Sequence, residues 1–84
     1  MNPDKIEAIL RTITVLNALN GEQGSYRLGE LVKWSHIPRA TCDRYLKEMV
    51  RMKLLEKTAL KYRGEECSGF AITEDGQDFY HQIY

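Results

Sequence analysis

The side chains best suited to bind a charged partner are cations on one predicted helix of this 84-residue sequence. Arg44, Lys47 and Arg51 are spaced i, i+3 and i+7, so a helix places them in one outward stripe. Arg39 precedes them, and the small Ala40 permits close approach of a partner. Guanidinium and ammonium groups in such a stripe donate hydrogen bonds to phosphates and to base edges. The stripe therefore predicts binding of a polyanion.

The geometry of this helix suggests a different role for each cation. Arg44 is the first choice for a base-edge contact, with the paired donors that guanine accepts. Lys47 and Arg51 are expected to neutralise phosphates, which positions a protein without specifying a sequence. Arg39 could do either. The complete predicted contact set on this helix is Arg39, Ala40, Thr41, Asp43, Arg44, Lys47 and Arg51.

The same stripe has a second interpretation, as the solvated face of an amphipathic helix. Asp43 lies four residues after Arg39, and Glu48 lies four residues after Arg44. This spacing allows ion pairs within the helix, as on ordinary surface helices. The surrounding sequence has to distinguish the two interpretations.

Charge is distributed unevenly along the chain, although the formal net charge is zero. Residues 1–25 hold two Lys or Arg and three Asp or Glu. Residues 26–63 hold ten Lys or Arg and four Asp or Glu, whereas residues 64–84 hold five acidic residues and no Lys or Arg. A basic segment within a balanced chain is typical of a polyanion-binding face.

The chain is too short for most enclosed active sites. With 84 residues it holds one compact core and little further material for a catalytic cavity. His36 and His81 lie far apart and lack partners at metal-ligand spacing. Ser35 beside His36 is not a catalytic pair, and there is no Gly-rich phosphate loop. We expect a single domain over residues 1–84, with no catalysis, cofactor, metal or small-molecule ligand.

The cysteines and the hydropathy pattern indicate the compartment. Cys42 and Cys67 are too few for a disulfide scaffold and are expected to be reduced, with Cys42 filling core space. No apolar run approaches the roughly 20 residues that cross a membrane, and the sequence does not start with a secretion signal. We therefore expect a cytoplasmic protein without a membrane partner.

The first predicted helix begins after Asn2, which can cap it, and ends at residues 20–21. Pro3 suits its first turn. Its apolar residues recur every three or four positions, which indicates one buried stripe. The members of this stripe are Ile6, Ile9, Leu10, Ile13, Leu16 and Leu19.

A short strand at residues 26–28 and a second helix at residues 29–35 follow. Trp34 is expected to lie in the core. After a break at residues 35–37, Pro38 fits the first position of a third helix, predicted to run over residues 39–53. The buried face of the third helix is predicted to be Cys42, Tyr45, Leu46, Met49 and Val50.

The hydrophobic period then changes from helix to strand. Residues 54–62 and 69–73 are predicted strands, joined by a turn-rich segment at residues 63–68. Thr73 is predicted to cap a last helix. The hairpin at residues 57–72 would form a wing, on which Lys61 and Arg63 could contact a nucleic-acid backbone, with Lys57 nearby.

These elements define a mainly α fold with a small β-hairpin, that is, an α+β winged helix-turn-helix. It has a three-helix core, a wing and a C-terminal helix. Two helices joined by a short turn, the second one rich in exposed cations, are the layout of DNA-binding helix-turn-helix proteins. The second helix of such a pair enters the major groove.

Two segments resemble known bacterial regulators. The runs HIPRATCDRYL at residues 36–46 and MKLLE at residues 52–56 are similar to the recognition-helix region of the IclR type. The run ITEDG at residues 72–76 resembles the "Leu-Thr-x-x-Gly" step of MarR- and PadR-like winged helices. The resemblance implies DNA contacts at Thr41 and Arg44. Two features depart from it: no segment is long enough for an effector-binding domain, and Lys53 replaces a glycine often found before the wing.

The sequence thus predicts sequence-specific binding of double-stranded DNA by a small transcriptional regulator. The alternative is a winged-helix protein-interaction module without DNA binding, which the zero net charge and the acidic last segment favour. A monomer specifies few base pairs, so we expect a homodimer on a two-fold site. Its interface could use the first helix and the aromatic tail, although both could instead close the monomer core. The tail residues are Phe79, Tyr80, Ile83 and Tyr84.

Overall fold

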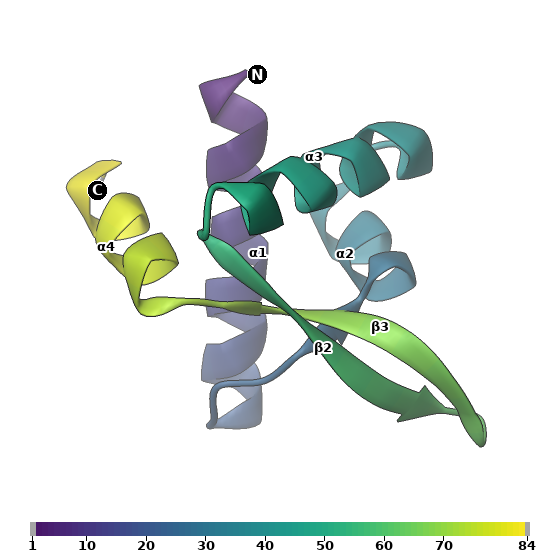
Figure 1. Ribbon diagram of the computed structural model, residues 1–84. Helices are drawn as coiled ribbons and strands as arrows, with labels where there is room; N and C mark the ends of the chain where they lie inside the picture. Colours follow the sequence, from purple (N-terminus) through teal and green to yellow (C-terminus); the bar gives the residue numbers. More distant parts are fainter. Residues whose placement is uncertain (1, 84) are drawn as a thin grey trace.

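A computed structural model describes residues 2–83, which form four helices and a three-stranded antiparallel sheet (Figure 1). The strand order is β1-β3-β2, so β3 is central. This arrangement confirms the predicted α+β winged-helix architecture. The elements are α1 (Pro3–Asn20), β1 (Tyr26–Arg27), α2 (Leu28–Ser35), α3 (Arg39–Arg51), β2 (Leu55–Tyr62), β3 (Glu65–Ile72) and α4 (Glu74–Ile83).

Helix α1 forms because its ends are capped and one side is apolar. The Asn2 side chain accepts a hydrogen bond from the Asp4 N–H at 2.9 Å, and Gly21 ends the helix with a φ of 73°. The predicted apolar stripe is buried as far as Leu16, but Leu19 is 73% exposed. At about 3.6 residues per turn, Leu19 lies well away from the centre of the stripe. Its predicted burial is therefore wrong.

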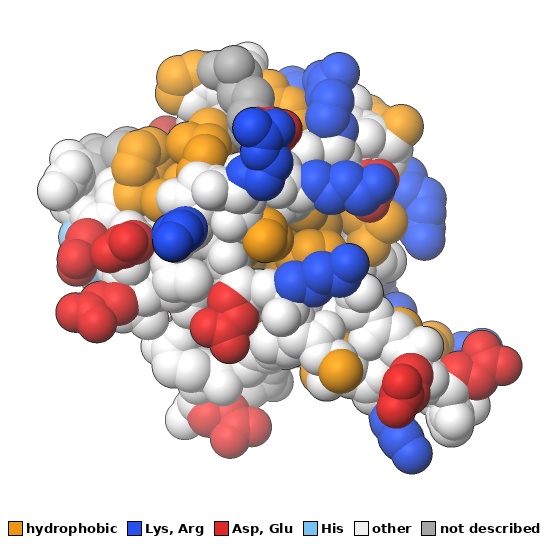
Figure 2. All heavy atoms as spheres, viewed as in Figure 1, with side chains coloured by type: hydrophobic (Ala, Val, Ile, Leu, Met, Phe, Trp, Pro, Cys, Tyr) orange, Lys and Arg blue, Asp and Glu red, His pale blue; other side chains and the backbone are white. Residues whose placement is uncertain are grey.

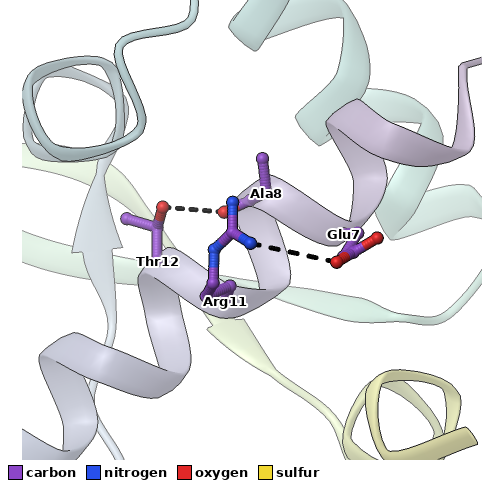
Figure 3. A network of polar contacts seen from close by, with 4 residues as sticks. All are labelled: Glu7, Ala8, Arg11 and Thr12. Atoms are coloured by element: carbon purple, nitrogen blue, oxygen red, sulfur yellow. Dashed lines mark hydrogen bonds and ion pairs between the residues drawn. The ribbon is translucent and has the colours of Figure 1, made fainter. Parts of the chain in front are cut away.

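The outer side of α1 carries local polar contacts (Figure 3). Arg11 lies 3.9 Å from the Glu7 carboxylate, one turn earlier, and the Thr12 hydroxyl donates to the Ala8 carbonyl at 2.7 Å. On the same helix Val15 is half exposed. The outer side of α1 is thus a mixed surface, with an apolar portion toward its C-terminus.

Helix α2 is short, and only Leu31 is fully buried from it. Leu28 and Val32 are partly buried and pack against the core. Trp34 is 53% exposed, so the prediction that it lies in the core is wrong. At helical spacing Trp34 falls on the flank of α2, away from the side that Leu28, Leu31 and Val32 share.

The turn between α2 and α3 uses a left-handed residue. His36 has a φ of 61°, and its N–H donates to the Val32 carbonyl at 3.0 Å. Ile37 is buried. Pro38 follows with a ψ of 144° and is the N-cap of α3, so the prediction that it is the first helical residue is wrong. The Pro38 carbonyl accepts the Cys42 N–H at 2.8 Å, so the proline begins the helix from outside it.

Helix α3 ends two residues earlier than predicted, at Arg51. Lys53 has a φ of 63°, a left-handed conformation that ends a right-handed helix. Its N–H donates to the Val50 carbonyl at 3.0 Å. The Leu54 N–H donates to the Met49 carbonyl at 2.9 Å. These bonds satisfy the last carbonyls of the helix in the manner usually achieved with glycine. Lys53 therefore takes the place of the glycine that the resemblance leads one to expect.

The wing is a regular hairpin with a two-residue turn. Arg63 and Gly64 have φ values of 53° and 80°, the left-handed pair that a tight type I′ turn requires. The predicted turn over residues 63–68 is wrong, because residues 65–68 belong to β3 and pair with residues 59–62 of β2. The second strand of the hairpin is therefore longer than the sequence indicated, because it begins at Glu65.

A polar junction joins the wing to α4. The Thr73 hydroxyl donates to the Lys53 carbonyl at 2.6 Å, lies 3.0 Å from the Leu54 carbonyl, and accepts the Gly76 N–H at 2.9 Å. The Thr73 N–H also donates to the Leu54 carbonyl at 3.1 Å. Thr73 therefore caps α4, as predicted, and fixes both ends of the hairpin at the same point.

Helix α4 packs on α1, on the opposite side of α1 from α2 (Figure 1). Phe79 and Tyr80 are partly buried and pack against the core, which confirms them as core-closing residues. Tyr84 and the side chain of Ile83, which the sequence placed in the aromatic tail, lie outside the described residues.

Gly76 makes the closest backbone approach in this junction, which leads to the first prediction. A Cβ at Gly76 would overlap the Leu54 carbonyl oxygen and lie 2.9 Å from an Ile72 side-chain carbon. We expect Gly76→Ala to lower the free energy of unfolding by about 1–3 kcal/mol, as overpacking does. Gly29→Ala is the control, because the nearest atom, on the Arg27 side chain, is 3.4 Å away. Urea denaturation of both variants measures the difference; equal stability would contradict the close approach.

Candidate nucleic-acid interface

One side of α3 is buried, so the opposite side faces solvent. Cys42, Leu46 and Met49 are fully buried, and Tyr45 is only 4% exposed. The other side of α3 is therefore exposed to solvent, and Lys and Arg side chains gather there (Figure 2). The exposed members of the predicted contact set are Arg39, Ala40, Arg44, Lys47 and Arg51, and the half-buried ones are Thr41 and Asp43.

The two acids of α3 pair with different cations from those predicted. Asp43 lies 3.0 Å from the Lys47 ammonium, and Glu48 lies 2.8 Å from the Arg51 guanidinium. In both pairs the acid precedes the cation by three or four residues, the favoured order, because helical side chains lean toward the N-terminus. The predicted pairs of Asp43 with Arg39 and of Glu48 with Arg44 are therefore wrong.

This pairing leaves two arginines of the contact set without a carboxylate. Within residues 2–83, neither Arg39 nor Arg44 forms an ion pair. The Arg44 guanidinium carbon lies 5.7 Å from the centre of the Tyr45 ring, and the residue is exposed. Arg39 and Arg44 can therefore direct their hydrogen-bond donors toward an external acceptor without first breaking an ion pair.

A groove of about 670 Å³ separates α3 from the hairpin. Its apolar lining residues include Leu28, Val50 and Phe70, together with the ring of Tyr62. Figure 2 shows hydrophobic atoms exposed between the Lys and Arg side chains of this region. Among the described residues, Asp43 is the only acidic one that lines the groove, and the basic lining residues are Arg27, Arg39, Lys47, Arg51 and Lys57. The groove is therefore lined by more basic than acidic residues, with apolar residues between them.

The wing contributes unequally along its length. Lys57 lies opposite Phe70 near the base of the hairpin, and it lines the groove. Lys61 lies opposite Glu66, so an acidic neighbour opposes its charge near the tip. Arg63 is exposed in the turn. The structure thus brings Lys57 together with the cations of α3, while Lys61 and Arg63 stand further out.

Arg27 is the groove residue that sequence reasoning missed. It lies at the end of β1, before α2, and far from the basic helix in sequence. The pairing of β1 with β3, and the packing of α2 that follows it, bring Arg27 to the groove. A lone arginine between two short elements gives no periodic signal, so the sequence alone offered no means of finding it.

The acidic residues of α4 do not cover α3. Figure 1 shows α4 on the left, on the side of α1 opposite α2. In the same view, Figure 2 shows Asp and Glu side chains gathered on the left, away from the Lys and Arg side chains over α3. Glu74 and Asp75 lie in the first turn of α4 and are exposed. The cationic and acidic surfaces are therefore separated.

Other site chemistries have no support in the described residues. Between residues 2 and 83, no three His, Cys, Asp or Glu side chains gather as a metal site would require. Cys42 and Cys67 are both free thiols. Nor does any described helix combine the length and apolarity needed to cross a membrane.

This arrangement defines a winged helix-turn-helix domain, in which α2 and α3 form the helix-turn-helix and the hairpin forms the wing. The sequence profile of the IclR helix-turn-helix domain matches residues 8–59, more than half of the chain. The chain therefore belongs to the IclR helix-turn-helix domain family, and its fold is that of a DNA-binding helix-turn-helix domain. The alternative of a protein-interaction module is not favoured. No curated protein sequence matches that of this chain.

Solved structures share the fold at low sequence identity. BpsR of Bordetella bronchiseptica, whose DNA binding is described as regulated by 6-hydroxynicotinic acid, matches 94% of this chain at 20% identity with a TM-score of 0.72. The match covers 50% of the BpsR chain, so this chain spans about half its length.

Two further structures come from archaeal sources. AF1382 of Archaeoglobus fulgidus matches 99% of this chain and 82% of its own, at 17% identity and a TM-score of 0.67. Stf76 of the Sulfolobus islandicus plasmid-virus pSSVx matches 87% of this chain and 94% of its own, at 13% identity and a TM-score of 0.57. At these identities the similarity supports the fold alone.

The two cysteines offer a chemical test of which face of α3 is buried. Burial raises the pKa of the Cys42 thiol, and the neighbouring Asp43 carboxylate raises it further, although Ser35 and Arg39 oppose the change. Cys67 is half-buried and lines the groove. Because the thiolate is the reactive form, we expect iodoacetamide at pH 8 to modify Cys67 at least roughly tenfold faster than Cys42.

Peptide mass spectrometry of the native protein at successive times measures both rates. The control is the protein in denaturant, in which the two thiols should react alike. Equal rates in the native state would mean that Cys42 is not held in the core, and hence that α3 does not present the face described above.

Proposed function

We propose that this chain is a small transcriptional regulator that binds double-stranded DNA sequence-specifically, with α3 in the major groove and the hairpin as a wing. The observation that carries the proposal is the outer face of α3. There Arg39 and Arg44 are exposed and have no carboxylate partner within residues 2–83, and the opposite face is buried in the core. A helix presented in this way can enter a groove about 12 Å wide.

The contacts of α3 suggest a division of roles. Arg44 offers the paired donors that fit guanine O6 and N7. Lys47 and Arg51 are held by Asp43 and Glu48 at the surface. Such exposed pairs contribute only about 0.2–1 kcal/mol, so phosphates can replace the carboxylates as partners. Lys47 and Arg51 would therefore position the protein on the backbone without reading the sequence.

The N-terminal part of α3 would approach the bases most closely. Ala40 has a short side chain and is exposed, so it does not hold the helix away from the groove floor. Thr41 is half-buried beside it and can offer its hydroxyl. Arg39 would contact either a base or a phosphate, and Asp43 takes part through Lys47.

The groove between α3 and the wing suits one DNA strand. Its lining has one acid against five cations, so its field attracts phosphates. Lys57 would contact the backbone at the base of the wing, with Lys61 and Arg63 further along it. We include in the proposal that residues 1–84 act as one cytoplasmic domain that binds DNA without catalysis.

The third prediction concerns how this binding responds to salt and to two substitutions. Affinity measured by fluorescence anisotropy should fall by orders of magnitude between about 50 and 200 mM salt, because each phosphate contact releases counterions. Arg44→Ala should lose about 1–3 kcal/mol of preference at one base pair. Lys47→Ala should weaken binding to all sequences alike and lower the salt slope by about 1.

The two variants control for each other, because both remove one exposed cation from the same face of α3. If they changed sequence preference equally, Arg44 would not be a base-reading residue. Binding that did not depend on salt would contradict the proposal as a whole and would point to a protein-interaction module.

We further propose that two copies bind a two-fold site. One α3 reaches only a few base pairs, and two-fold operators match dimeric helix-turn-helix proteins. The exposed apolar residues Val15 and Leu19 of α1 support an interface there, with Trp34 beside them. Their exposed fractions are 49%, 73% and 53%. They line a hollow of about 190 Å³.

Selection of bound sequences from a random duplex pool tests this arrangement. The expected motif has two inverted half-sites about 34–36 Å apart, which is one turn of DNA. Sedimentation should then find two chains on each duplex. Leu19→Gln should reduce this to one chain without unfolding, because Leu19 packs little in the monomer. Recovery of a single asymmetric motif bound by one chain would contradict the dimer.

A further inference from the structure

The outer half of the wing extends beyond the three-stranded sheet. Strand β1 pairs with β3 at only two positions, Tyr26 with Phe70 and Arg27 with Gly69. From residue 59 to residue 68 the hairpin therefore consists of β2 and β3 alone. An isolated two-stranded ribbon is marginally stable in water. Something else must hold this part of the wing in place if it is to contact DNA in a fixed geometry.

One contact links the outer wing to the body of the protein. The Arg27 guanidinium carbon lies 3.6 Å from the centre of the Tyr62 ring, the last residue of β2 before the turn. Because β3 lies between β1 and β2, the Arg27 side chain bridges across the central strand. Guanidinium planes stack well on aromatic rings.

Arg27 is itself held firmly at the start of α2. Its Nε lies 3.5 Å from a Glu30 carboxylate oxygen, and its backbone N–H donates to the same oxygen at 3.4 Å. Only 27% of the Arg27 side chain is exposed. The guanidinium is therefore engaged on two sides by groups of this chain, which limits its own reach toward a phosphate.

We propose that Arg27 is a positioning residue for DNA binding, which holds the outer wing beside α3 by stacking on Tyr62. Arg27 and Tyr62 both line the groove, so their contact sets the distance between its walls. The DNA-binding part of this inference rests on the function proposed above. Loss of the stack should release the wing and its phosphate contacts but leave base reading by Arg44 unchanged.

Four variants separate stacking from charge. Arg27→Lys keeps the positive charge but removes the planar group, and Tyr62→Leu removes the ring. Tyr62→Phe keeps the ring and should behave as the unchanged protein. Lys61→Ala is the control for loss of charge on the wing, because Lys61 lies opposite Glu66 and has no part in the stack.

The first measurement is amide hydrogen exchange by NMR on the protein without DNA. We expect Arg27→Lys and Tyr62→Leu to raise exchange rates several-fold in residues 59–68, with no change in α1 or α3. Tyr62→Phe and Lys61→Ala should leave these rates unchanged. The second measurement is DNA affinity, which Arg27→Lys and Tyr62→Leu should weaken by about threefold to tenfold, the range of a cation–π contact.

The two measurements distinguish the failures. Unchanged exchange in both Arg27→Lys and Tyr62→Leu would overturn the positioning role. Weaker DNA binding by Arg27→Lys with unchanged exchange would also overturn it, because Arg27 would then contact DNA directly. If the unaltered protein did not bind DNA, the proposed function would fail, while the exchange rates would still decide whether Arg27 holds the wing.

Discussion

Burial of one face of α3 is the interaction on which the rest of the structure depends. Cys42, Leu46 and Met49 join residues of α1 and α2 in a single core cluster. Each large apolar side chain buried this way contributes about 1.5–3 kcal/mol, whereas an exposed ion pair contributes about 0.2–1 kcal/mol. Packing therefore fixes the rotation of α3, and its surface charges adapt to that rotation. The cationic face points outward because the opposite, apolar face of α3 is buried in the core.

The wing is fastened at two points of different character. At its base, hydrogen bonds from Thr73 to the carbonyls of Lys53 and Leu54 close the hairpin within the fold. Toward its tip, the Arg27–Tyr62 stack is a single side-chain contact at a half-exposed site. The base is therefore the more rigid end.

The sequence predicted those features that periodic patterns specify, and missed those that depend on a single backbone angle or a distant contact. The buried face of α3 followed from apolar spacing, because Cys42 and Met49 repeat with the helical period. The end of α3 at Arg51 did not, since it depends on Lys53 adopting a positive φ without being glycine. The two-residue turn was hidden for the same reason at Arg63. Arg27 reaches the groove through strand pairing and helix packing, which a local pattern does not encode.

The zero net charge does not oppose a DNA-binding role, because the acidic residues of α4 lie away from the Lys and Arg side chains gathered over α3 (Figure 2). Helix α1 lies between α4 and α2 (Figure 1), and a helix with its side chains is about 10–12 Å across. The screening length at physiological salt is about 8 Å, so surface charges on the two sides influence each other weakly. A phosphate near α3 therefore responds to the local excess of Lys and Arg. At longer range the acidic helix lowers the attraction to any polyanion, which should favour close, well-fitted contacts over non-specific ones.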